Sequence, residues 1–217
     1  MNREKIKEIF KKNLKWIVLF VCLVGFLALA EDVYNHDLMR GDIIGYNFVS
    51  KYLISDSMTP IMKGITWVGS APVLISIALI LFVLIKNKKT GLAIFLNLFV
   101  VSLLNQILKF ILQRPRPTEY RIINESGYSF PSGHSMISMA FYGFLIYLIY
   151  KNIKNKYLKW ILIVLLSLLI LGIGVSRIYL GVHYTSDVLA GFLISISYLV
   201  IYIKLYSEKI IGKEYCK

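Results

Sequence analysis

Residues 160–175, Trp160-Ile-Leu-Ile-Val-Leu-Leu-Ser-Leu-Leu-Ile-Leu-Gly-Ile-Gly-Val175, carry no charge and a single hydroxyl group. A run of this kind approaches the length of about 20 apolar residues that a helix needs to cross a bilayer. Five other apolar stretches of comparable length occur in the chain, so the sequence predicts six membrane-spanning helices. They cover residues 16–30, 60–85, 91–112, 133–150, 160–175 and 188–203.

The composition supports this interpretation. Hydrophobic residues make up 57% of the 217 residues and charged residues 17%, which is too apolar for a water-soluble globule. The net charge of +13 lies in short clusters between the apolar runs, so it predicts contact with the lipid bilayer and no nucleic-acid partner. Cys22 and Cys216 are too few for a disulfide framework or a zinc site. We expect an all-α, polytopic membrane protein with one domain over residues 1–217.

The distribution of Lys and Arg predicts the orientation. Of the 25 basic residues, 17 fall within residues 3–15, 86–89, 151–159 and 204–217. Lys and Arg are retained on the cytoplasmic side, so both termini, residues 1–15 and 204–217, are predicted to be cytoplasmic. Residues 28–30, Ala-Leu-Ala, also fit the end of a cleavable signal peptide. Either outcome leaves Glu31 outside.

The segment between the first two spans has a helical pattern. Apolar residues recur at helical spacing, and Asp42, Asn47 and Lys51 fall elsewhere. This pattern predicts a helix lying in the outer membrane interface, although a packed connector would fit it equally well. The long second run contains Pro72, which can kink it or divide it. The apolar positions of the interfacial segment are Ile43, Tyr46, Val49 and Leu53.

Three polar segments lie at the predicted outer ends of helices. The first is residues 109–117, Lys-Phe-Ile-Leu-Gln-Arg-Pro-Arg-Pro. The prolines disfavour helix in the residues before them, so the chain should bend near Arg114. Lys109, Arg114 and Arg116 could then converge on an anion. As an alternative, the three could be interfacial anchors whose charges reach toward water.

The second segment is residues 130–135, Phe-Pro-Ser-Gly-His-Ser, at the start of a predicted helix. Free backbone N–H groups at a helix start attract anions, and glycine permits close approach. His134 adds a titratable group to this position. The plain structural alternative is that Ser132 is only the N-cap of the helix.

The third segment, residues 176–187, joins the last two spans and contains Ser176, Arg177, His183 and Asp187. If the chain is already helical at His183, the i, i+4 spacing puts Asp187 on the same face. The carboxylate could then orient the imidazole. Alternatively, Asp187 complements the helix dipole and forms an ion pair with Arg177.

Together the three segments provide cations, a helix N-terminus, two histidines and a carboxylate at one membrane depth. Phosphoryl transfer uses this set of groups, because an unprotonated imidazole can attack phosphorus while cations neutralise the phosphate oxygens. A two-metal phosphatase would need clustered carboxylates, whereas the outer acidic residues are scattered along the chain. We therefore expect neither a metal nor another cofactor.

These motifs resemble the three-part signature of the type 2 phosphatidic acid phosphatase superfamily. Lys109 is followed by Arg116-Pro117, then residues 131–134, then Ser176-Arg177, His183 and Asp187, within about residues 105–190. The resemblance implies a metal-independent, six-helix membrane phosphatase that forms a phosphohistidine intermediate. The implied substrates are membrane lipids such as undecaprenyl pyrophosphate, phosphatidylglycerophosphate or phosphatidate.

The resemblance also implies a function for each residue of the signature. His183 would be the nucleophile, Asp187 its orienting partner and His134 the general acid. The groups expected to bind phosphate are Lys109, Arg116, Ser132, Gly133 and Arg177. Arg114 is outside the signature, and the resemblance assigns it no function.

Two other classes of protein could hold a lipid phosphate. A transporter would be expected to carry polar groups at mid-membrane, and the second, fifth and sixth predicted spans have no charged residue in their cores. A non-catalytic binding protein would be expected to lack a catalytic residue, yet the signature is intact. We expect a cell-membrane enzyme with an extracytoplasmic active site; nothing in the sequence indicates its oligomeric state.

Overall fold

The computed structural model describes residues 3–35 and 39–211, and within these ranges the regular structure is helical. Along the chain, the short helices α2 and α3 and the apolar helix α4 come between the long helices α1 and α5. A turn of π-helix, Ser207–Ile211, extends α8. The α-helices are α1 (Arg3–Tyr34), α2 (Arg40–Tyr52), α3 (Met58–Val68), α4 (Ala71–Leu84), α5 (Lys88–Leu112), α6 (Gly133–Asn152), α7 (Lys156–Tyr179) and α8 (Thr185–Tyr206).

Five segments of the described chain are long and apolar enough to cross a membrane: 13–34, 88–112, 133–152, 156–179 and 185–209. A sixth span forms if α3 and α4, which meet at an angle of 50°, are counted together. The predicted all-α membrane fold is confirmed. The break between α3 and α4 comes at Gly69 and Ser70, with Pro72 in the first turn of α4, so the predicted division of this run is present.

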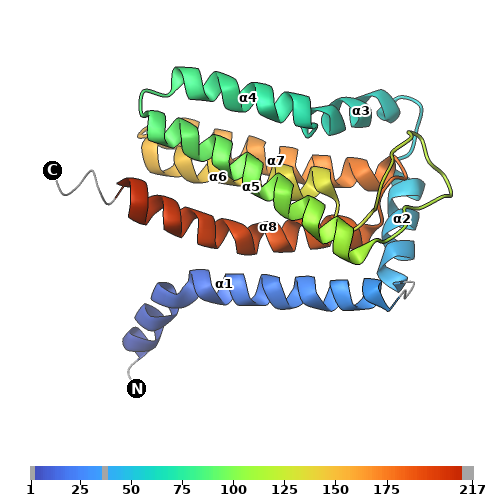
Figure 1. The fold of residues 1–217 in the computed structure, drawn as a ribbon, viewed down its shortest axis with the longest axis horizontal. Helices are drawn as coiled ribbons and strands as arrows, with labels where there is room; N and C mark the ends of the chain where they lie inside the picture. The colour runs from blue at the N-terminus through green and yellow to red at the C-terminus, as the bar shows by residue number, and fades with distance from the viewer. Residues whose placement is uncertain (1–2, 36–38, 212–217) are drawn as a thin grey trace.

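The long helices run side by side, with α2 lying across one end of the bundle (Figure 1). The connection between α5 and α6 lies at that same end, whereas the start of α1 and the end of α8 lie at the other. Helix α6 packs against α5, α7 and α8, and α1 packs along α8. Leu74, Phe141, Phe144 and Ile173 are among the buried side chains of the main core.

The segment predicted to be an interfacial helix or a packed connector forms helix α2. Val49 is buried, as its apolar position suggested, whereas Ile43 is 56% exposed. Asp42, a charged residue, is only 5% exposed. An ion pair with Arg114 compensates the cost of burying this charge.

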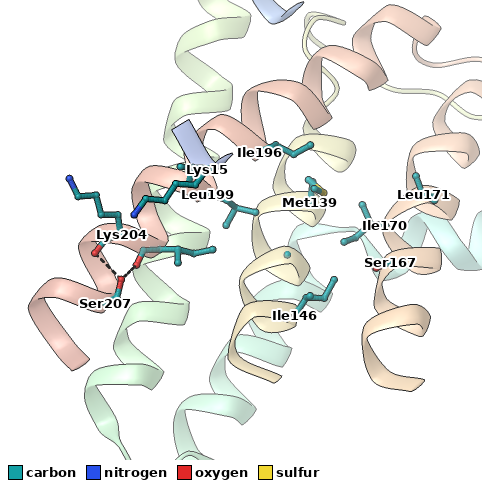
Figure 2. A pocket seen from close by; sticks show the side chains of 13 residues that line it. Lys15, Met139, Ile146, Ser167, Ile170, Leu171, Ile196, Leu199, Lys204 and Ser207 are labelled. Atoms are coloured by element: carbon teal, nitrogen blue, oxygen red, sulfur yellow. Dashed lines mark hydrogen bonds between the residues drawn. The ribbon is translucent and has the colours of Figure 1, made fainter. Parts of the chain in front are cut away.

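A groove of about 550 Å³ lies at the bundle end that contains the end of α8. Figure 2 shows apolar side chains of α6, α7 and α8, including Met139, Ile170 and Leu199, together with Lys15 and Lys204. None of the predicted site residues lines this groove. The three polar segments meet at the other end of the bundle, which α2 crosses.

Candidate active site

The three polar segments meet in a cavity of about 450 Å³. They reach it from the end of α5 and the connection after it, the start of α6, and the end of α7 with the turn that follows. Two predicted site residues, Ser132 and Asp187, are fully buried and do not line the cavity. The predicted residues that line it are Lys109, Arg116, Gly133, His134, Arg177 and His183.

His183 and Asp187 are in contact, although not for the reason that the spacing suggested. Helix α8 begins at Thr185, so His183 precedes it and the two residues do not share a helical face. Asp187 lies in the first turn, and its carboxylate turns back to accept the backbone N–H of Tyr184 at 2.9 Å. His183 Nδ1 lies 3.2 Å from the same oxygen, Oδ2.

The hydrogen bonds of His183 determine its tautomer. Arg116 Nη1 can only donate, and it lies 3.0 Å from His183 Nε2, so Nε2 is the acceptor. Nδ1 then carries the proton and donates it to Asp187. Burial lowers the pKa of His183 to about 4, although Asp187 acts in the opposite direction, so the imidazole is neutral at pH 7. A neutral ring with its Nε2 lone pair on the cavity side is the nucleophilic form.

Hydrogen bonds hold the three cations of the cavity in place before any ligand binds. Lys109 Nζ donates to the carbonyl oxygens of Tyr128 and Ser129. Arg177 Nη1 donates to Thr66 Oγ1 at 2.8 Å, and its Nε is buried without a hydrogen-bond partner among the described residues. Fixed cations stabilise developing negative charge without reorganisation, as phosphoryl transfer requires. Arg116 donates to the carbonyl oxygens of Ser126, Gly127 and Val182.

The start of α6 also presents backbone groups to the cavity. Ser132 is the N-cap: its Oγ accepts the Ser135 N–H, and its own N–H donates to the Asp187 carbonyl at 3.0 Å. The Ser132 Oγ accepts in the cap and does not line the cavity, so its predicted contact with phosphate stays a prediction. Gly133 and His134, both in the cavity wall, are the first residues of the helix. A Cβ on Gly133 would lie 3.0 Å from Asn105 Oδ1, so the helix start packs closely on α5.

His134, in the first turn of α6, lines the same cavity as Glu125 of the α5–α6 connection. Both residues line the cavity, and the His134 ring has no hydrogen-bond partner among the residues that the structure describes. Gly69 lies beside the ring: a Cβ there would meet His134 Cδ2 at an ordinary 3.4 Å, and only its 2.8 Å contact with Ile173 Cγ2 would be too close. The ring is therefore available to a ligand in the cavity.

Sequence reasoning missed Glu125 in the connection between α5 and α6. Its Oε1 lies 2.6 Å from Arg177 Nη2, and its Oε2 lies 4.0 Å from Arg116 Nη2. Burial acts to raise the pKa of Glu125, but the hydrogen bond and charge of Arg177 outweigh it and hold the pKa below its usual value. A carboxylate between two arginines in the cavity indicates that this position accommodates an anion.

Arg114 and Asp42 form a second missed contact. The predicted convergence of Arg114 with Lys109 and Arg116 on one anion was wrong, because Arg114 points to two carboxylates and is not in the cavity wall. The alternative pairing of Asp187 with Arg177 was also wrong, since Arg177 pairs with Glu125. No local spacing connects residue 42 with 114, so a sequence pattern could not reveal this pair.

The arrangement defines a helical membrane protein with a preorganised anion site and a neutral histidine facing it. Among residues 3–35 and 39–211, no group of three or more His, Cys, Asp or Glu side chains is placed to hold a metal. Residues 90–211 match the model of the PAP2 superfamily. The chain belongs to this superfamily, and the resemblance drawn from the motifs is confirmed.

Two curated relatives match almost the whole chain. Phosphatidylglycerophosphatase B of Bacillus subtilis (strain 168) is 32% identical over 192 residues, which are 85% of this chain and 92% of the relative. Undecaprenyl-diphosphatase of Sulfolobus acidocaldarius is 26% identical over 214 residues, with coverages of 89% and 93%.

Two solved structures share the fold. The crystal structure of a transmembrane PAP2-type phosphatidylglycerolphosphate phosphatase from Bacillus subtilis has a TM-score of 0.74 and 28% identity, covering 88% of this chain and 96% of the other. The crystal structure of Aquifex aeolicus LpxE has a TM-score of 0.60 and 23% identity, with coverages of 73% and 92%, and supports the fold alone.

Proposed function

We propose that this chain removes phosphate from a phosphomonoester or pyrophosphate of a membrane lipid, with His183 as the nucleophile. The family and its relatives make the chain a membrane lipid phosphatase. The observation that supports His183 is its geometry: Nε2 accepts a hydrogen bond from Arg116 on the cavity side while Nδ1 faces Asp187. A bound phosphate would take over the donor of Arg116 and leave Nε2 free to attack.

The reaction proceeds in two balanced steps. Nε2 of His183 forms a bond to phosphorus as the bond to the leaving oxygen breaks, and His134 gives that oxygen a proton. Water then attacks the phosphohistidine, the P–N bond breaks, and His134 takes the proton from the water. Lys109, Arg116, Arg177 and the N–H groups at the start of α6 neutralise the phosphate oxygens in both steps.

The shape of the cavity supports a lipid substrate. Beyond the polar residues, its walls continue between α4 and α5 as apolar side chains. An acyl or prenyl chain can occupy this part while its phosphate lies among the cations. A lipid anchored in the bilayer would reach the site by lateral diffusion with its phosphate at the correct depth. The apolar residues include Leu74, Ile75, Phe95, Leu98 and Phe99.

We infer that residues 1–217 form one domain, with cytoplasmic termini and an extracytoplasmic active site. The start of α1 and the end of α8 lie at the bundle end opposite α2 and the α5–α6 connection (Figure 1). That connection carries Arg116 and Glu125, which line the cavity. The 17 basic residues of the four clusters favour the cytoplasm for the end with the termini. The names of the relatives suggest two substrate classes, a glycerophospholipid monophosphate and an undecaprenyl pyrophosphate.

Phosphate release by the detergent-purified protein tests the activity and ranks the substrates. The panel contains phosphatidylglycerophosphate, undecaprenyl pyrophosphate, phosphatidate and diacylglycerol pyrophosphate, with a water-soluble phosphate ester as comparison. We expect at least one lipid to be hydrolysed far faster than the soluble ester, and His183→Ala to remove that activity. A consistent preference for the soluble ester would contradict the lipid assignment.

Cysteine labelling in intact cells tests the orientation. In a background with serine at positions 22 and 216, the exposed Thr118 and Lys154 are replaced separately by cysteine. The cysteine at position 118 should react with a membrane-impermeant maleimide in intact cells, whereas the one at position 154 should react only after lysis. The opposite labelling would invert the proposed topology without affecting the proposed chemistry.

A further inference from the structure

A buried ion-pair network behind His183 connects α2 with the start of α8. Arg114 donates from Nη2 to Asp42 Oδ2 at 2.7 Å and from Nη1 to Asp187 Oδ1 at 2.6 Å. Asp42 also accepts the backbone N–H of Ser186 at 2.7 Å and its hydroxyl at 2.9 Å. Arg114, Asp42, Asp187 and Ser186 are all buried. One guanidinium therefore joins two carboxylates from different parts of the chain.

Several contacts fix the orientation of Arg114. Its guanidinium carbon lies 4.0 Å from the centre of the Tyr184 ring, and Nη1 also donates to Ser186 Oγ at 2.8 Å. A guanidinium group that lies over an aromatic ring and donates hydrogen bonds from both terminal nitrogens has little freedom to rotate. The carboxylate of Asp42, on α2, holds Nη2 of this guanidinium, and Nη1 holds the carboxylate of Asp187.

The two oxygens of Asp187 consequently have different partners. Oδ1 accepts from Arg114, whereas Oδ2 accepts from Ser129 Oγ, the Tyr184 N–H and His183 Nδ1. Without the bond to Oδ1, the carboxylate could turn and present a different oxygen to the imidazole. The orientation of the His183 ring thus depends on a residue that His183 does not touch.

We propose that Arg114, anchored by Asp42 of α2, is a positioning residue that holds Asp187 so that its Oδ2 faces Nδ1 of the nucleophile. The inference rests on the proposed function, in which His183 attacks phosphorus. Arg114 does not line the cavity, so its effect passes through Asp187 and concerns the chemical step more than substrate binding. Asp42 lies before residue 90, outside the segment that matches the family model. Helix α2 thereby contributes to catalysis from outside the signature.

Steady-state kinetics of Arg114→Gln, Arg114→Lys and Asp42→Asn test the proposal on detergent-purified protein. For Arg114→Gln we expect kcat to fall by about 10-fold to 100-fold, the effect of a small misplacement of a reacting group. KM should stay within about threefold, since the phosphate ligands are untouched. Arg114→Lys keeps the positive charge but lacks the two-pronged guanidinium, so it should lower kcat less than Arg114→Gln does. Arg121→Gln is the matched control, because Arg121 is exposed and bonds to the Pro117 carbonyl; it should keep full activity.

A double-mutant cycle tests whether Asp42 acts through Arg114. Asp42→Asn alone should lower kcat, because the Arg114 guanidinium loses one anchor. In the Arg114→Gln background the same substitution should change kcat by less than about twofold, since residues that act on one target are not additive. Multiplicative losses would show that Asp42 and Arg114 act separately, and would overturn the network.

Two further results would overturn the positioning function. One is an Arg114→Gln enzyme with unchanged kcat, even if its melting temperature falls, because the contact would then be purely structural. The other is a rise in KM with unchanged kcat, which would make Arg114 a substrate ligand. If Arg114→Gln does not fold, Arg114→Lys and Asp42→Asn decide the question by the same criteria. An active His183→Ala enzyme would instead refute the proposed function itself.

Discussion

Arg177 and Glu125 form a 2.6 Å ion pair inside the cavity that contains the candidate nucleophile. Arg177 is only 1% exposed, so its charge would be costly to bury without a compensating anion. Glu125 supplies that anion from the connection between α5 and α6, next to Arg116. A phosphate that binds to Arg177 must share it with this carboxylate or displace it.

Replacing Glu125 by glutamine should strengthen the binding of phosphate mimics. The substitution keeps the shape of the side chain but leaves Arg177 and Arg116 without their anionic neighbour. We expect the inhibition constant of vanadate to fall by about threefold to tenfold, as the loss of one competing charge-assisted hydrogen bond implies. A higher inhibition constant in Glu125→Gln would contradict this competition and indicate that Glu125 helps to hold the ligand.

Replacing His183 by alanine should abolish turnover, because the substitution removes the imidazole that is proposed to attack phosphorus. We expect a loss of at least about 1,000-fold with every lipid substrate. Rapid acid-free quenching of the unmodified enzyme during turnover of ³²P-labelled lipid should trap label on His183. Label on another residue, with activity retained in His183→Ala, would exclude His183 as the nucleophile.

Replacing His134 by alanine should slow the reaction according to the leaving group. A general acid contributes about 100-fold to 10,000-fold when the leaving oxygen needs a proton. The loss should be large for a phosphomonoester, whose leaving group is an alkoxide, and smaller for a pyrophosphate, whose leaving group is already stable as an anion. Equal losses on phosphatidate and undecaprenyl pyrophosphate would rule out general-acid catalysis by His134.

The pH dependence of kcat/KM should report the lowered pKa of His183. Burial lowers this pKa from 6.5 to about 4, so the imidazole stays neutral and nucleophilic well below pH 6.5. As the pH falls through about 4 the ring is protonated and activity should be lost. The profile is corrected for the ionisation of the substrate, and recovery at pH 7 serves as the control for unfolding. An acid limb at or above pH 6.5 would contradict the prediction.

Catalysis should continue in excess EDTA and stop in vanadate. The charge of the phosphate is neutralised by Lys109, Arg116 and Arg177, so no divalent cation is required, and the same cations can hold a five-coordinate phosphate mimic. Phosphate release is measured after dialysis against the chelator. Loss of activity that magnesium restores would refute metal-independent catalysis.

The sequence alone determined the membrane fold and the chemical groups of the site. Apolar runs near bilayer length predict helices because lipid provides no partner for free backbone groups, so the spans could be located with small errors at their ends. The first span, for example, covers residues 13–34, where residues 16–30 were predicted. Signature residues such as Lys109, His134 and His183 are close to helix ends. The predicted topology places these ends at the same membrane depth, so the sequence alone predicted that the residues lie near one another.

Only the tertiary structure decided which charges pair with one another. Asp42, Arg114 and Glu125 follow no helical spacing with their partners, and their contacts depend on how α2 and the connection before α6 pack over the bundle end. The predicted relation between His183 and Asp187 gave the correct contact from an incorrect premise, because a turn of the carboxylate at the start of α8 replaces a shared helical face. Spacing along a chain predicts contacts only between residues about one helical turn apart. A buried ion pair between distant segments forms only when folding removes both charges from water and places them next to each other.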